Sequence, residues 1–251
     1  MPSSLNIKPQ ISDQIGLGYY TFFPNSGISL ETEAYYKLMR HQIDYLDHAH
    51  MLLNPTVENQ LLFGKAKAYG LEFMLRKNEG RITGWVGYTI SKVKKRFDEI
   101  NGGRPFPAFY DRPHEGNLFV SYRLRPRIKL GLNWNIASGA AFTSPTSFYY
   151  YDGQELPVFT ERNNDRFRTY HRLDLDAEFR LNRSSTKFEH SISISIFNLY
   201  NLNNDVFRNF NKTKINEDFV VPGNLINATR TYSHIYLYKT VPSIAYNFKF
   251  H

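Results

Sequence analysis

The sequence predicts an all-β fold class, an antiparallel transmembrane β-barrel portion of about nine long strands with short periplasmic turns and long extracellular loops. Three observations predict it. Apolar and polar residues alternate in nine segments, short and long links alternate between them, and 16% of the residues are aromatic although the mean hydropathy is only −0.48. Strands with one lipid-facing side and one watery side give this combination, since Tyr and Trp gather at the interfaces.

The first four expected strands share this alternation. In the second of them, Tyr36 and Leu38 alternate with Tyr35 and Lys37. Successive strand residues point to opposite faces, so this order separates a largely apolar face from a more polar one. The four segments are residues 14–23, 30–38, 69–76 and 82–90.

Five further strands follow, and two of them show the pattern most clearly. In one, Ile192, Ile194 and Ile196 alternate with serines. In another, one face carries five charged residues in succession, from Arg172 to Arg180, and such a face needs water on a soluble surface or in a barrel lumen. The last segment is one long strand or is interrupted at Pro242. The five segments are residues 117–124, 128–136, 171–181, 188–197 and 235–250.

The links between these strands alternate in length, as they do in membrane barrels. Nine strands in this order place the N-terminal residues outside the cell and His251 in the periplasm. A single-chain bacterial barrel normally has an even strand count with both ends in the periplasm, so we expect the missing strands to lie upstream. The expected turns are residues 24–27, 77–80, 125–127 and 182–187, and the long links are residues 40–65, 93–114, 143–170 and 202–231.

Other features of the sequence narrow the class. The chain has no cysteine and no apolar run of about 18 residues, which excludes disulfides and a transmembrane helix. Residues 1–6 lack the basic and apolar regions of an export signal, which indicates a mature product or a truncated reading frame. The net charge of +8 is scattered, with one dense run at Lys92–Arg96, so it favours solvated surface over nucleic-acid binding. Contact with lipopolysaccharide phosphates at the outer rim is a further possibility.

Six stretches carry a family resemblance by their order and spacing. They are Ser12–Tyr19, Ala68–Phe73 with Gly84–Ser91, Ile100–Pro107 with Tyr110–His114, Tyr170–Leu175, Phe197–Asn201 and Pro242–Phe250. Together they resemble the C-terminal barrel of TonB-dependent receptors of the Bacteroidetes type. The resemblance implies a 22-stranded barrel of which residues 1–251 form the C-terminal part, without the N-terminal plug domain. It also implies a terminal aromatic residue read by the assembly machinery, here Phe250, although His251 follows it.

The family resemblance also implies a function, the energy-dependent import of a scarce nutrient (siderophore, vitamin, glycan or peptide) across the outer membrane. It implies no enzymatic activity and no cofactor. The implied partners are outer-membrane lipid and lipopolysaccharide, the missing barrel strands and plug, the TonB complex through that plug, and a surface lipoprotein, but no nucleic acid. Two alternatives stay open: a self-contained small barrel acting as a passive pore or adhesin, and a soluble all-β binding protein.

Six loop residues are the candidates for substrate contact. The rings of Tyr149, Tyr150 and Tyr151 could stack on a sugar or chelate, or pack on other loops or lipid headgroups. Around Tyr110 and Arg112 we expect loop anchoring more than recognition. The six candidates are Arg104, Tyr110, Arg112, Tyr149, Tyr150 and Tyr151.

Two groups of titratable side chains suggest metal binding or acid–base catalysis. In both cases we prefer the interpretation without a functional site. A loop with His and Asp residues could bind a divalent metal, but the spacing is loose and an ordinary polar loop is expected. Three carboxylates on one strand could act as acids and bases, but lumen electrostatics and cross-strand ion pairs are expected instead. The first group is His41, Asp44, Asp47, His48 and His50, and the second is Asp174, Asp176 and Glu178.

Overall fold

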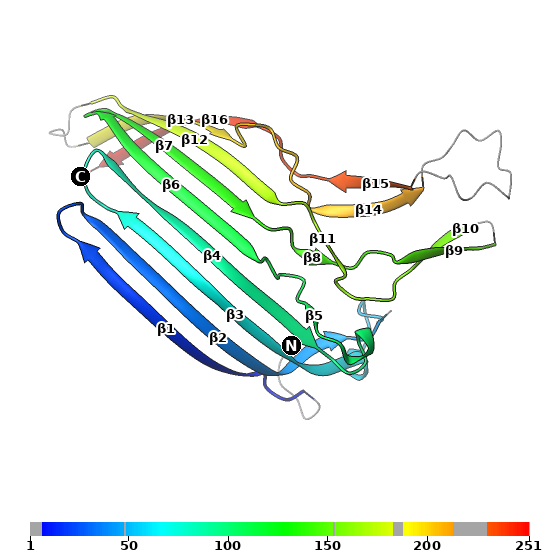
Figure 1. Ribbon diagram of the computed structural model, residues 1–251. Helices are drawn as coiled ribbons and strands as arrows, with labels where there is room; N and C mark the ends of the chain where they lie inside the picture. The colour runs from blue at the N-terminus through cyan, green and yellow to red at the C-terminus, as the bar shows by residue number, and fades with distance from the viewer. Residues whose placement is uncertain (1–6, 48, 153, 183–187, 213–229, 251) are drawn as a thin grey trace, which may run out of the picture.

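The computed structural model describes residues 7–47, 49–152, 154–182, 188–212 and 230–250. Its main sheet is a curved wall of nine long strands, and each of these nine pairs antiparallel with the one that follows it in chain order (Figure 1). The nine strands of this path confirm the number and order predicted from the alternation. They are β1 (Ile11–Phe23), β2 (Ile28–Tyr45), β3 (Leu61–Lys77), β4 (Ile82–Arg96), β6 (His114–Arg125), β7 (Ile128–Ala137), β12 (Tyr170–Arg180), β13 (Phe188–Phe197) and β16 (Val241–Phe250).

The short turns lie at one end of the wall and the long links at the other, called here the turn end and the loop end (Figure 1). Helical structure in the described residues is limited to two 3₁₀ turns, η1 (Val57–Gln60) and η2 (Asn101–Gly103). None of the described helices has the length and apolar character needed to span a bilayer. The expected turn at 182–187 lies, apart from Asn182, outside the described residues.

Strands β2, β3 and β4 are longer than the alternation indicated, because they continue into the links expected at 40–65 and 93–114. β2 runs on to Tyr45, β3 begins at Leu61 and β4 ends at Arg96. On these extensions lysines and arginines occupy the face that is apolar in the rest of each strand, so the alternation is inverted there. A bulge in β2 after Met39 accommodates His41, whose φ is 53°.

The links expected at 143–170 and 93–114 also contain short strands where polar loops were expected. Residues 143–170 hold the hairpin of β9 (Ser147–Tyr151) and β10 (Gln154–Val158), and β8 (Ala141–Phe142) pairs with β11 (Asp165–Arg166). β5 (Phe106–Pro107) adds to β4 at the loop end. The polar composition of these segments does not indicate that they form short paired strands.

The last predicted strand, 235–250, is divided differently from the prediction. Ile235 ends β15 (Arg230–Ile235), which pairs with β14 (Phe207–Lys212) in a separate ribbon. The break covers residues 236–240, where Thr240 Oγ1 donates to the Asn198 carbonyl at 2.8 Å. Pro242 lies inside β16 and is tolerated there, because β16 is an edge strand of the sheet.

One face of the wall is apolar across all nine strands. Register places the apolar residues side by side from strand to strand, as with Leu132 next to Leu175 and Ile194 next to Ile244. These side chains stay exposed: Leu17 at the β1 edge is 79% accessible and Ile244 at the β16 edge 73%. A soluble sheet would bury such a face, since burying each Leu or Ile stabilises by about 1.5–3 kcal/mol.

The opposite face is polar and hollowed. Arg172 pairs with Asp174 on its own strand at 2.9 Å, and Arg180 pairs with Glu189 of the next strand at 3.6 Å. Gly131 faces Asp176, and a Cβ at Gly131 would lie only 1.9 Å from the Asp176 carboxylate oxygen. Four of the buried apolar residues form a small cluster at the loop end, made of Leu62, Phe97, Ile100 and Phe106. The wall therefore has no dry core between its two faces.

Candidate functional site

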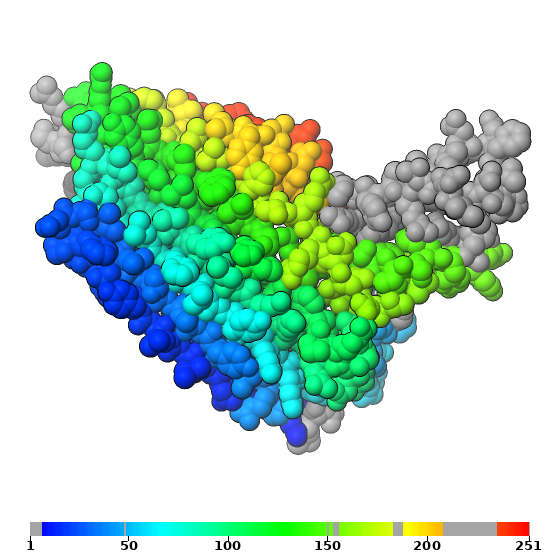
Figure 2. All heavy atoms as spheres, viewed as in Figure 1, coloured from blue at the N-terminus to red at the C-terminus, as the bar shows by residue number. Residues whose placement is uncertain are grey.

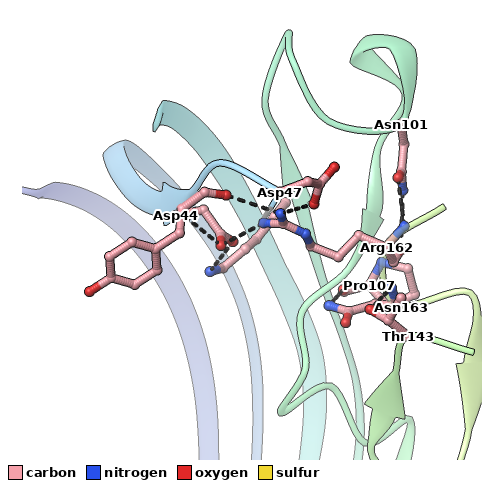
Figure 3. Close-up of polar contacts among 9 residues, drawn as sticks. Asp44, Asp47, Asn101, Pro107, Thr143, Arg162 and Asn163 are labelled. Atoms are coloured by element: carbon pink, nitrogen blue, oxygen red, sulfur yellow. Dashed lines mark hydrogen bonds and ion pairs between the residues drawn. The ribbon is translucent and has the colours of Figure 1, made fainter. Parts of the chain in front are cut away.

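Three links at the loop end are tied together by one arginine. Arg162, between β10 and β11, reaches the end of β2, where its guanidinium donates to Asp44 at 2.8 Å and to the Tyr45 carbonyl at 3.0 Å (Figure 3). It also pairs with Asp47, and Lys95 of β4 lies 3.4 Å from Asp44. The Arg162 side chain is only 17% exposed, so these charge-assisted hydrogen bonds are partly screened from water.

Two asparagines complete this network, which we call the loop tie. The Asn101 side chain accepts from the Arg162 backbone amide at 2.7 Å and donates to the Arg162 carbonyl at 3.1 Å. The Asn163 side chain donates to the Pro107 carbonyl at 2.8 Å, and its backbone amide donates to Thr143 Oγ1 at 3.1 Å (Figure 3). Both asparagines have φ near 54°, a region that Asn tolerates better than most residues.

A second group of contacts, which we call the Asp111 anchor, also joins links at the loop end and is centred on a buried carboxylate. Asp111 is 1% exposed and accepts from the Val93 amide at 2.5 Å. It pairs with Arg166, whose guanidinium also donates to the Asp111 carbonyl at 2.7 Å and the Gly139 carbonyl at 3.1 Å. Burying this charge is tolerated because the arginine and the amide compensate it. The anchor fixes the link between β4 and β6 to the link between β7 and β12.

The polar face is hollowed just inside this anchored end. Tyr110 lines a hollow of about 380 Å³ together with Tyr35, Glu33 and Glu72. A neighbouring hollow of about 530 Å³ shares the two glutamates and adds Trp85. Burial, and then the nearby Asp111 carboxylate, raise the pKa of Tyr110, so its phenol stays protonated and can donate a hydrogen bond.

The described members of the six predicted contact residues have different surroundings. Arg104 pairs with Glu161 at 2.6 Å on the exposed rim, and Arg112 supplies a carbonyl that accepts from Ser91 Oγ at 3.4 Å. Tyr149 and Tyr151 lie exposed on β9, and the side chain of Tyr150 lies outside the described residues. Tyr110 lines a hollow of the polar face. Ligand contact by the set stays a prediction.

Sequence reasoning missed two groups that the structure brings forward. Glu33 and Glu72 are direct cross-strand partners facing the hollows, and their positions in the polar register of β2 and β3 were the available signal. Arg162 gave no such signal, because its partner Asp44 lies 118 residues away.

The histidine and aspartate loop does not gather metal ligands. Asp44 and Asp47 are engaged by Arg162, and His41 Nδ1 lies 3.0 Å from the Pro9 carbonyl. His48 lies outside the described residues. In the part of the chain that the structure describes, no three His, Asp or Glu side chains are placed to hold a metal ion together.

Comparison with protein families gives one match. A family model described as "TonB dependent receptor-like, beta-barrel" covers residues 2–202. No curated protein matches the sequence.

Several solved structures share the fold. The ferric-catecholate import receptor Fiu from Escherichia coli K12 has a TM-score of 0.60 at 15% identity, over 98% of this chain and 29% of that chain. The ferripyoverdine receptor of Pseudomonas aeruginosa has a TM-score of 0.57 at 12% identity, over 97% and 28%. The FrpB iron transporter from Neisseria meningitidis has a TM-score of 0.56 at 12% identity, over 97% and 32%. This chain thus spans about 28–32% of the length of these structures.

Proposed function

Because this chain belongs to the family of TonB-dependent receptor-like β-barrels, we propose that residues 1–251 form the C-terminal barrel part of an outer-membrane transporter, without its plug. The observation that carries the proposal is the apolar face, which continues across all nine strands while the opposite face stays polar. In a bilayer the first face contacts hydrocarbon and the second faces the lumen. The turn end is then periplasmic and the loop end extracellular.

The wall needs further strands to close around a lumen. Within the described residues β1 and β16 are the two edges of the sheet, and β1 lies along a free side of the molecule in Figure 2. Unpaired backbone groups at both edges are costly in a bilayer, so we propose that other strands of the complete barrel pair with them. The open sheet disfavours a self-contained small barrel.

We propose that the complete protein imports a scarce nutrient and catalyses no reaction. An iron-loaded siderophore is the first cargo to test, because the names of two structures with this fold include a ferric-catecholate and ferripyoverdine. A vitamin, a glycan or a peptide comes next. The anchored loops and the hollow beside Tyr110 would present the binding surface, and the plug and TonB complex would couple import to energy.

The other proposed partners follow from the position of the wall. Outer-membrane lipid and lipopolysaccharide would cover the apolar face, and a surface lipoprotein could cap the loop end. We propose no nucleic-acid partner.

The test is fractionation followed by uptake. The protein should be found in the outer-membrane fraction and be released only by detergent. Cells that lack its gene should lose uptake of one labelled chelate under iron limitation and regain it with the gene restored. Release as a soluble protein without detergent would refute the barrel, whereas normal uptake of all four cargo classes would refute the transport role.

A further inference from the structure

The 3₁₀ turn η2 contains a dipeptide that is prone to a spontaneous chemical change. Asn101 is followed by Gly102, and the sequence has no other Asn–Gly dipeptide. Asparagine is among the thermolabile residues of proteins, because the next main-chain nitrogen can attack its side-chain amide carbon. Glycine after the asparagine hinders this attack least, since it has no Cβ. Gly102 is exposed, and a Cβ built there would meet no atom within 4 Å, so solvent water reaches the segment.

The shape of η2 is unusual for its residues. Asn101, Gly102 and Gly103 have φ of 53°, 63° and 73°, so three successive residues lie in the left-handed region. Asparagine enters this region only occasionally, whereas the two glycines adopt it or leave it at little cost. Within η2 the turn is closed by one bond, from the Gly103 amide to the Ile100 carbonyl at 3.0 Å. Contacts from outside η2 therefore decide whether Asn101 keeps this conformation.

The loop tie occupies the side chain that would react. Asn101 Oδ1 accepts from the Arg162 amide at 2.7 Å, and Asn101 Nδ2 donates to the Arg162 carbonyl at 3.1 Å (Figure 3). Both bonds direct the Asn101 amide away from its own main chain, so both must break before Cγ can turn toward the Gly102 nitrogen. The attack then starts from a state in which the loop tie is open, and its rate follows the population of that state.

We infer that Asn101 is a deamidation site controlled by the loop tie, which converts an opening of the tie into a permanent change. In the open state the Gly102 nitrogen forms a bond to Asn101 Cγ. The Cγ–Nδ2 bond breaks, and Nδ2 leaves as ammonia together with the proton of the Gly102 amide. Water then adds to one of the two carbonyl carbons of the resulting succinimide ring, which opens to aspartate or isoaspartate. The reaction uses only this chain and solvent water.

Neither product rebuilds the loop tie. In aspartate an oxygen replaces Nδ2, so it faces the Arg162 carbonyl oxygen instead of donating to it. In isoaspartate one side-chain carbon becomes part of the main chain, which lengthens η2 inside the turn that Gly103 and Ile100 close. A carbonyl that loses its donor in a partly buried place destabilises the closed state. The link between β10 and β11 therefore stays released from η2 after the reaction.

The test measures deamidation at Asn101 in the complete protein that contains this chain, purified in its native state and incubated at neutral pH. Peptide mass spectrometry detects the exchange of the amide for an acid. A free peptide with the sequence of residues 97–105 gives the rate without protection. We expect the protein to react at least about 100-fold more slowly than the peptide, because the closed loop tie must open first.

Two variants open the loop tie from different sides and leave Asn101 in place. Arg162→Ala removes the guanidinium contacts to the end of β2, and Asn163→Ala removes the bond to the Pro107 carbonyl. Each should speed deamidation at Asn101 by at least about 10-fold, because each raises the population of the open state.

The matched control for these variants is Arg168→Ala. It removes an ion pair with Asp205 at the same end of the wall, and that pair involves no residue of the loop tie. Its deamidation rate should equal that of the parent protein. Equal acceleration in all three variants would overturn control by the loop tie.

A fourth variant, Asn101→Asp, reproduces one of the two products. The Asn163 amide donates to Thr143 Oγ1 at 3.1 Å, so its hydrogen exchange reports on the closed loop tie. Loss of one hydrogen bond should speed this exchange by about 5-fold. Parent protein in which Asn101 has deamidated on incubation should show the same change.

Each outcome supports or overturns a defined part of the inference. Deamidation of the parent protein as fast as that of the free peptide would overturn the protection. Rates that stay at the parent value in Arg162→Ala and Asn163→Ala would overturn the control, and unchanged exchange in Asn101→Asp would overturn the permanent release. If a variant fails to fold, the loss of protection in its strand ladders shows it, and the comparison of the parent protein with the peptide still decides.

Discussion

Replacing Arg162 by Ala should release the links at the loop end from one another without unfolding the wall. The substitution removes a charge-assisted bond to Asp44 and a bond to the Tyr45 carbonyl, in a place where Arg162 is 17% and Asp44 21% exposed. A bond to a charged group contributes about 1.5–3 kcal/mol, and a neutral one about 1 kcal/mol. The exposed partner Asp47 adds little. The expected loss is about 3 kcal/mol in the docking of the loop.

Amide hydrogen exchange measures this loss directly. The backbone amides of Arg162 and Asn163 donate to Asn101 Oδ1 and Thr143 Oγ1, so they are protected only while the loop tie is closed. A loss of about 3 kcal/mol corresponds to roughly 100-fold faster exchange. Amides of the strand ladders should keep their protection, because the wall is held by its own pairing.

The matched control is Arg104→Ala on the same rim. Arg104 and Glu161 are 70% and 43% exposed, so removing this pair should cost less than about 1 kcal/mol. The reasoning is refuted if the two variants change exchange equally. It is also refuted if Arg162→Ala lowers the melting temperature of the whole barrel.

Three further predictions test other parts of the structure. Ile194→Arg on the apolar face should lower the stability of the barrel in the membrane by about 2–4 kcal/mol, whereas Ser193→Arg on the polar face should be nearly neutral. The temperature at which each variant changes from folded to unfolded migration in gel electrophoresis compares the two, and equal temperatures would contradict the assignment of the two faces. Gly139→Ala should destabilise by about 1–3 kcal/mol because its Cβ would lie 1.7 Å from the Phe167 backbone carbonyl oxygen, whereas Gly131→Ala should cost less because its Cβ meets only the exposed Asp176 side chain, which can rotate away; equal melting temperatures of the two variants would contradict this. The phenol of Tyr110 should ionise above its ordinary pKa of 10.0, so its stabilising contribution is complete below pH 10 and lost at higher pH; an ultraviolet titration compared with Tyr110→Phe detects this late phase, and ionisation at or below pH 10 would contradict it.

The sequence determined the wall almost completely. Alternation of the kind seen at Ile192, Ile194 and Ile196 is a local property, because each residue in a strand faces away from its neighbours whatever the rest of the chain does. It therefore identified nine strands, their order and the two faces. It failed at Lys65 to Lys67, where exposed lysines alternate with the small buried Ala66 and Ala68, so the polar side chains occupy the face that is apolar in the rest of the strand.

The candidate site was decided by tertiary structure. Asp44 meets Arg162, and Lys67 meets Lys94, only because curvature and register bring distant segments together. The alternation specifies which face a side chain occupies but not which residue of the next strand lies opposite, since register depends on turn geometry and bulges such as the one at His41. A contact across 118 residues leaves no periodic trace, so only the folded wall could reveal it.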